Sequence, residues 1–324
     1  MKNFGFKKFA GLLLVFALVF PVITAQEKND AIKAFNEAVE LMKSDPVGSI
    51  ASFENCIKLC VQVGDSALDI QVKAEQVLPG LYYQKAYNVL VKDKNNSGGL
   101  LVSKQAMKVA EKYNNGGVKE NINKLLVQAY SAMASEYVNK KEYENAILAF
   151  DSVLAINPGH LNALYYKALM YRGLNKDNEF EAAIDLYVSK LNPGTDADKL
   201  EQARKAARDY FRIAGGKANQ AKKYADAIVL LDKAAKYGED ENICYQYASV
   251  YNKQNNRAKA LEYAQKGLGL STGTAEDKAK YYFEMAEAQT NLGKKTEACE
   301  SYKNAKYGPF VQASDAQLKN LGCE

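Results

Sequence analysis

Residues 128–158, QAYSAMASEYVNKKEYENAILAFDSVLAINP, decide how this chain of 324 residues folds. Apolar and small residues in this stretch recur at intervals of three and four rather than alternating, which predicts two amphipathic helices and no strand. Three versions of one turn followed by a helix start occur along the chain, at Lys141–Ile147, Asn178–Ile184 and Lys222–Ile228. The sequence is therefore expected to repeat a single helical hairpin.

The offsets of seven residues in this stretch resemble those of the tetratricopeptide repeat, a helix-turn-helix unit of about 34 residues. These residues are Tyr130, Met133, Ala134, Tyr137, Ala146, Phe150 and Pro158. Tyr130 replaces the tryptophan that is usual at the first offset. The resemblance is clear over residues 127–308 and weaker upstream, where Glu37 occupies an offset at which a small residue is expected.

Small residues recur at two offsets of the repeat. Two antiparallel helices approach closely only where no side chain intervenes, so we interpret these positions as the helix crossings. The first helices carry Ala134, Ala168, Gly215, Ala248 and Ala286, and the second helices carry Ala146, Ala183, Ala227, Ala260 and Ala298. Phe150 and Pro158 complete the predicted packing set. The second-helix alanines are 37, 44, 33 and 38 residues apart, which predicts an irregular array.

The resemblance implies an all-α fold, a right-handed superhelical solenoid of about six to seven helical hairpins. We expect a signal peptide over residues 1–25, degenerate hairpins over 26–117, the clear repeat array over 118–308 and a C-terminal capping helix over 309–324. A cap is expected because the last hairpin of a solenoid would otherwise leave its apolar face in water.

The first 25 residues have the pattern of an export signal. Three lysines precede an apolar run from Phe9 to Phe20, and Val22–Ala25 ends in a small residue suited to cleavage. The run is shorter than the roughly 20 residues of a membrane-spanning helix, and no cysteine precedes Cys56 as a lipid acceptor. We therefore expect an exported chain, periplasmic or secreted, which is soluble, is not a lipoprotein and has no stable membrane insertion after cleavage.

Charge and residue types exclude several functions. Without residues 1–25, 40 basic and 38 acidic residues remain, and a net charge of +2 does not favour nucleic acid as a partner. The single histidine, His160, has no cysteine nearby to activate, and no phosphate-binding glycine motif follows a strand. We predict no enzymatic activity, no catalytic residue, no cofactor and no metal site.

The five cysteines are irregularly spaced and form neither a zinc pattern nor a complete disulfide framework. Cys56 and Cys60, four residues apart on a predicted helix, are interpreted as buried apolar thiols. Cys299 and Cys323 are expected to bond in an oxidising compartment, because the terminal helix must fold back over the last hairpin.

The resemblance also implies a binding surface, because the first helices of such arrays line a concave groove. Offset five places Ser131, Tyr165, Arg212, Tyr245 and Phe283 in this groove. Offset two places Asn162 and Asn242 there, and offset twelve places Val138, Arg172 and Asn252 there. Rings supply contact area and amides bond a bound main chain, which favours a protein or peptide partner of unknown identity.

Two alternatives remain open at this stage. The chain contains 22 tyrosines, so those at groove offsets could instead be packing residues. The groove aromatics could also stack on sugar rings, which predicts carbohydrate or cell-wall glycan binding. Removal of Arg212 should weaken polypeptide binding, whereas sugar stacking should depend chiefly on the rings.

Overall fold

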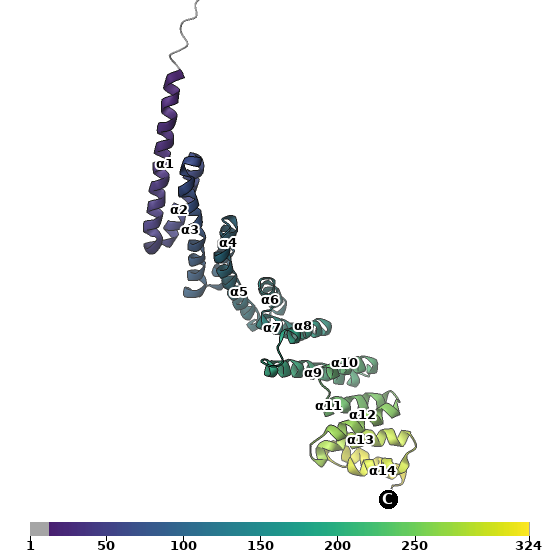
Figure 1. Cartoon of the computed structure of the whole chain (residues 1–324). Helices are drawn as coiled ribbons and strands as arrows, with labels where there is room; N and C mark the ends of the chain where they lie inside the picture. Colours follow the sequence, from purple (N-terminus) through teal and green to yellow (C-terminus); the bar gives the residue numbers. More distant parts are fainter. Residues whose placement is uncertain (1–12, 324) are drawn as a thin grey trace, which may run out of the picture. The chain divides into compact units, whose positions relative to one another are not determined.

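The computed structural model describes residues 13–323, with side chains from Glu27 onward. Within these residues every element is a helix and no strand occurs, so the predicted all-α fold is confirmed. Figure 1 labels the helices in chain order. The chain divides into two compact units, with the boundary in the sequence between Leu174 and Asn175.

Unit 1 consists of three helical hairpins and one further helix. Its helices are α1 (Leu13–Ser44), α2 (Pro46–Val63), α3 (Leu68–Tyr87), α4 (Asn96–Lys112), α5 (Gly116–Asn139), α6 (Tyr143–Ile156) and α7 (Leu161–Gly173). A 3-10 turn (Asp65–Ala67) precedes α3, and a π-helical segment (Asn88–Lys92) follows it. Helices α1 and α2, α3 and α4, and α5 and α6 pack against each other.

Unit 2 begins with a single helix, followed by three hairpins and a terminal helix. Its helices are α8 (Asp177–Lys190), α9 (Ala197–Gln220), α10 (Tyr224–Lys236), α11 (Glu241–Lys253), α12 (Arg257–Leu270), α13 (Ala275–Asn291), α14 (Lys295–Asn304) and α15 (Val311–Leu321). A 3-10 turn (Gly308–Phe310) precedes α15. Helices α9 and α10, α11 and α12, and α13 and α14 pack as hairpins.

One turn geometry recurs between the two helices of four hairpins. Three residues connect α5 to α6, α9 to α10, α11 to α12 and α13 to α14, and the middle residue has a left-handed φ. These residues are Lys141 (61°), Lys222 (59°), Asn255 (61°) and Gly293 (74°). Lysine rarely adopts this conformation, so its recurrence at the same place in the turn indicates that these four hairpins are versions of one unit.

The predicted crossing residues lie in the core of the hairpins. The alanines at positions 134, 146, 168, 227, 248, 260, 286 and 298 are 0% exposed, and Phe150 is 5% exposed. Gly215 is also buried, and a β-carbon there would lie 3.0 Å from the Leu231 side chain. Close approach of the paired helices therefore depends on these small side chains.

Two residues of the predicted packing set differ from the prediction. Pro158 is exposed and does not pack in the core. It instead ends α6, because the residue before a proline prefers an extended backbone, and Asn157 is extended (φ −132°, ψ 90°). Ala183 is only half-buried, whereas its neighbour Ile184 is fully buried on α8. In α1 the buried small residue is Ala38 rather than the residue at position 37, and the Ser49 hydroxyl donates to its carbonyl oxygen at 2.7 Å.

The terminal helix α15 covers the last hairpin. Leu318 packs with Ala286 and Tyr302 in a cluster that also includes half-buried Leu321. The structure joins Cys299 and Cys323 by a disulfide with a Cα–Cα distance of 5.7 Å. The cap is thus held both by apolar contacts and by a covalent bond.

The predicted signal peptide lies partly outside the described residues, which begin at Leu13. Helix α1 starts there and continues without interruption past the expected cleavage site to Ser44. No helix in the described part of the chain has both the length and the apolarity needed to cross a bilayer.

Candidate functional site

Side chains of α5, α6 and α7 line a hollow of about 310 Å³ in unit 1, which we call the α5–α7 hollow. Its lining residues are Ser131, Ser135, Val138, Asn139, Phe150, His160, Asn162, Ala163 and Tyr166. Ser131, Val138 and Asn162 are at the offsets that the repeat resemblance places in the groove. Three positions on two different first helices therefore converge on one cavity.

The start of α7 is fixed by its capping residue. His160 is the N-cap of α7, and its Nδ1 accepts a hydrogen bond from the backbone N–H of Ala163 at 3.2 Å. In the neutral imidazole this bond places the proton on Nε2, which leaves a hydrogen-bond donor on the other side of the ring. His160 thus positions the first turn of α7, where Asn162 and Ala163 line the hollow.

The hollow combines an aromatic wall with polar groups. The rings of Phe150 and Tyr166 are stacked, with centroids 6.2 Å apart and an interplanar angle of 12°. Phe150 is 5% exposed and Tyr166 is 46% exposed, so the second ring is open to a ligand. The Ser135 hydroxyl donates to the carbonyl oxygen of Ser131 at 3.0 Å. The amides of Asn139 and Asn162 are exposed and can bond a ligand.

Two further predicted groove residues belong to α7. Tyr165 is half-buried and meets Tyr166 edge-on, with ring centroids 5.8 Å apart. Arg172 is half-buried in the last turn of the same helix. The predicted residue Tyr165 therefore contacts one wall of the hollow, although it does not line the cavity itself.

In unit 2, Arg212 is the predicted groove residue with unused bonding capacity. Its Nη2 lies 3.4 Å from Asp209 Oδ1, one turn earlier on α9. Its Nε is buried and has no hydrogen-bond partner among the described residues. Because this Nε is enclosed, a ligand carboxylate would have to pair with the part of the Arg212 side chain that is open to solvent, which is 25% exposed.

Tyr245 and Asn242 of α11 are held by contacts within the protein. Lys280 of α13 donates to Asn242 Oδ1 at 2.8 Å, and its ammonium lies 5.5 Å from the centre of the Tyr245 ring. Burial, with a smaller contribution from the Glu284 carboxylate, raises the pKa of Tyr245 to about 12. These two residues are therefore already engaged in joining α11 to α13.

Asn252 and Phe283 differ from the groove prediction. Asn252 is 6% exposed, and its amide donates to the Glu284 backbone oxygen at 2.9 Å and to Glu284 Oε2 at 2.7 Å. Phe283 packs under the cap, with its ring 5.9 Å from Tyr302 and 5.2 Å from Phe310. Both residues make contacts within the protein and are not available to a ligand. Helix α13 covers Asn252, and the 3-10 turn before α15 covers Phe283, whereas the repeat offsets predict that both face a groove.

A second hollow of about 280 Å³ lies in unit 2 between the start of α8 and α9, which we call the α8–α9 hollow. Its lining residues are Asn175, Asp177, Tyr210, Ile213, Ala214 and Lys217. The Tyr210 hydroxyl donates to Asp177 Oδ1 at 2.5 Å, which fixes two of the lining side chains. Ile213 is 49% exposed and adds an apolar surface next to Arg212.

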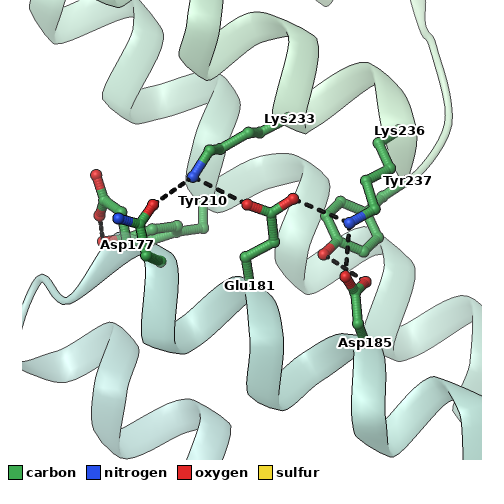
Figure 2. Close-up of polar contacts among 8 residues, drawn as sticks. Asp177, Glu181, Asp185, Tyr210, Lys233, Lys236 and Tyr237 are labelled. Carbon is green, nitrogen blue, oxygen red and sulfur yellow. Dashed lines mark hydrogen bonds and ion pairs between the residues drawn. The ribbon is translucent and has the colours of Figure 1, made fainter.

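An ion-pair network fastens α8 to α10 beside this hollow (Figure 2). Glu181 lies between Lys233 and Lys236, at 2.9 Å from each ammonium, and Lys236 also contacts Asp185 at 2.5 Å. The Tyr237 hydroxyl donates to Asp185 Oδ1 at 2.8 Å. Burial acts to raise the pKa of Glu181, but the two lysines hold it below its ordinary value. The network therefore ties the middle of α8 to the last turn of α10.

The described thiols are not activated for chemistry. Burial, followed by the neighbouring Cys60, raises the pKa of Cys56 to about 12. Burial and then Glu239 raise the pKa of Cys244 to about 12 as well. Thiols with raised pKa values are poor nucleophiles, which fits their interpretation as packing residues.

No protein-family model matches the sequence, and no curated protein matches it. Similar solved structures include a crystal structure of MamA protein, at 17% identity over 60% of this chain and 94% of that chain, with a TM-score of 0.35. The TPR protein YrrB, described as having an unusual peptide-binding site, is 15% identical over 55% of this chain and 84% of its own, with a TM-score of 0.33.

A tetratricopeptide repeat protein from Parabacteroides merdae ATCC 43184 is 16% identical over 90% of this chain and 99% of that chain, with a TM-score of 0.28. All three TM-scores are below 0.5. The fold assignment therefore depends on features of the chain itself, namely the recurring left-handed turn and the buried small residues at the helix crossings.

Proposed function

We propose that this chain, which has the helical hairpins of the tetratricopeptide-repeat fold, is a non-enzymatic scaffold that binds a partner polypeptide. The observation that carries the proposal is the α5–α7 hollow. Residues at the predicted groove offsets of α5 and α7 line it together with the exposed Tyr166 ring. Its volume of about 310 Å³ suits one large side chain of a partner together with the adjoining main chain.

The chemistry of the hollow suits a polypeptide. A side chain of the partner would pack on the stacked rings of Phe150 and Tyr166, where contact area is gained at low entropy cost. The amides of Asn139 and Asn162 each offer a donor and an acceptor, which match the N–H and C=O groups of an extended main chain. In unit 2, the exposed part of the Arg212 side chain offers a positive charge to an acidic side chain.

The proposed location is the cell envelope or the exterior, and it rests on the pattern of residues 1–25. A basic start, an apolar run and a small-residue end are typical of a cleaved export signal. The proposed organisation of the remainder is degenerate hairpins over 26–117, the repeat array over 118–308 and the cap over 309–324. Nucleic acid is not proposed as a partner, because 40 basic and 38 acidic residues remain after cleavage.

One observation favours a second candidate, the binding of a carbohydrate or cell-wall glycan. The Tyr166 ring is 46% exposed and lies beside the amide of Asn162, an arrangement that can also hold a sugar ring. However, Tyr245 and Phe283, two of the three rings predicted for sugar stacking, are engaged in internal contacts. The polypeptide is therefore the occupant that we propose.

The test is a pulldown from envelope extract with residues 26–324 as bait, followed by titration of the captured partner against variants. Tyr166→Ala and Asn162→Ala should each weaken binding by about 2 kcal/mol or roughly 30-fold. Leu148→Ala is the control, because Leu148 is 65% exposed on α6 and does not line the hollow. Unchanged affinity in both hollow variants would place the site elsewhere. Capture of a glycan whose affinity falls in Tyr166→Ala would favour the second candidate.

A further inference from the structure

A furrow of about 570 Å³ crosses the first two hairpins of unit 1, apart from the α5–α7 hollow. It is lined by second helices α2 and α4, with Leu78 of α3 also contributing to it. We call it the α2–α4 furrow. None of its lining residues is at a predicted groove offset or takes part in the proposed site.

The furrow has an apolar lining, of which one residue is open to water. Ile57 and Leu78 are buried, Val109 is half-buried, and Val61 is 63% exposed. A valine that remains so open within an apolar depression is a favourable contact for a partner side chain, because covering it removes apolar area from water. A small ligand would leave this open side hydrated, whereas a polypeptide segment laid along the furrow would cover it.

The charges at its edge indicate which segment fits. Lys58 and Lys112 are exposed lining residues, and no ion pair among residues 27–323 involves either of them. Glu54 is the acidic lining residue, and its carboxylate already accepts a hydrogen bond from the Tyr82 hydroxyl at 2.5 Å. Glu54 keeps its negative charge in this hydrogen bond, so the lining carries one negative charge against two positive ones, which lie on opposite walls, one on α2 and one on α4. The Lys112 ammonium also lies 4.9 Å from the centre of the Tyr113 ring, a contact that leaves its charge in place.

From this combination we propose that the α2–α4 furrow is a second interaction surface, which binds an acidic amphipathic segment of a partner protein. Large apolar side chains of the segment cover Ile57, Val61 and Val109, and its carboxylates pair with Lys58 and Lys112. This is the helix-in-groove mode of recognition, with charge complementarity setting orientation and partner choice. The protein would thus hold two polypeptides at once, one in each surface.

The test uses a phage-displayed library of random twelve-residue peptides, selected on the full chain without its leader. Selected peptides are then titrated against Lys58→Glu/Lys112→Glu and, separately, against Val61→Ser. Both changes are at exposed positions, so circular dichroism should show an unaltered fold. The matched control is Lys33→Glu/Lys43→Glu, which makes the same charge change at two exposed positions of α1.

We expect a class of selected peptides that carries at least two acidic and two large apolar residues. Its affinity should fall at least tenfold in Lys58→Glu/Lys112→Glu and at least threefold in Val61→Ser, and stay within twofold in the control. Selection repeated on the charge-reversed variant should yield basic peptides instead. Failure to select such a class, or binding that responds equally to the control, would overturn the proposal. Asn162→Ala should not affect these peptides, so failure here leaves the proposed function standing.

Discussion

Gly267 of α12 offers a quantitative test of the packing between successive hairpins. A β-carbon at this position would lie 2.7 Å from Tyr281 Cε1 and 3.1 Å from Cys244 Cβ. Tyr281 is fully buried on α13, and Cys244 is fully buried on α11. Neither neighbour is the free end of a flexible side chain, so the added methyl group must push the helices apart or displace the ring.

Two effects set the size of the expected change in Gly267→Ala. Overpacking a well-packed core costs about 1–3 kcal/mol, whereas replacing a helical glycine by alanine gains about 0.5–1 kcal/mol. The difference is a net loss of up to about 2.5 kcal/mol, and we expect a loss of about 1 kcal/mol in the free energy of unfolding. The measurement is urea denaturation followed by circular dichroism at constant m-value.

The matched control is Gly269→Ala, two residues later on the same helix. A β-carbon at Gly269 would meet nothing within 4 Å, so this substitution should be neutral or stabilise by up to about 0.5–1 kcal/mol. Tyr281→Leu should reduce the penalty of Gly267→Ala, with a coupling of at least about 0.5 kcal/mol in a double-mutant cycle. Equal effects at the two glycines, or no coupling, would show that α12 does not pack on α13 in this way.

Three further outcomes test other contacts. Mass spectrometry of the unreduced protein should find Cys299 and Cys323 bonded, and two free thiols would contradict this. Cys323→Ala should lower stability by about 3 kcal/mol, since the bond spans 24 residues. The pKa of Glu181 is lowered in the native state, so the ionised carboxylate stabilises the fold above the pKa of the unfolded state, and this stabilisation is lost as the pH falls through the folded-state pKa. Acid titration should therefore lower the free energy of unfolding of the wild type more than that of Glu181→Gln. Burial raises the pKa of Glu284, so the native state loses stability relative to the unfolded state as the pH rises above the ordinary pKa of 4.5. Glu284→Gln should therefore have a larger free energy of unfolding than the wild type at pH 7, and the difference should shrink on acidification. An acid-unfolding curve that either glutamine variant leaves unchanged would refute the corresponding assignment.

The helical hairpins could be predicted because the crossing residues leave a local signal. A small residue such as Ala134 or Ala248 recurs at a fixed offset, and its neighbours are apolar at intervals of three and four. The left-handed turn residue gives no such signal, because Lys141 and Lys222 are not residue types that favour this conformation. In α1, Ala31, Ala34 and Ala38 are all buried. The offsets place the small residue at position 37, one residue before Ala38, so the predicted register of this helix is wrong by one residue.

The candidate site was only partly predictable, because offsets describe one helix and burial depends on its neighbours. Ser131 and Asn162 line the α5–α7 hollow, and Ser135 and Asn139 could have been found by continuing from Ser131 in steps of four. No local pattern shows that Asn252 binds Glu284, 32 residues later in the sequence. The contact of Phe283 with Phe310 likewise depends on how the chain turns after the last hairpin.

Site-specific photo-crosslinking in envelope extract tests the central claim most directly, namely that a polypeptide occupies the α5–α7 hollow. A photoreactive phenylalanine analogue is placed singly at Ser131, Asn162 and Leu148, and the adducts are identified by mass spectrometry. The predicted result is one polypeptide crosslinked at Ser131 and Asn162 but not at Leu148, which is exposed on α6 outside the hollow. Adducts at Leu148 alone, or a glycan in place of a polypeptide at the two hollow positions, would contradict it.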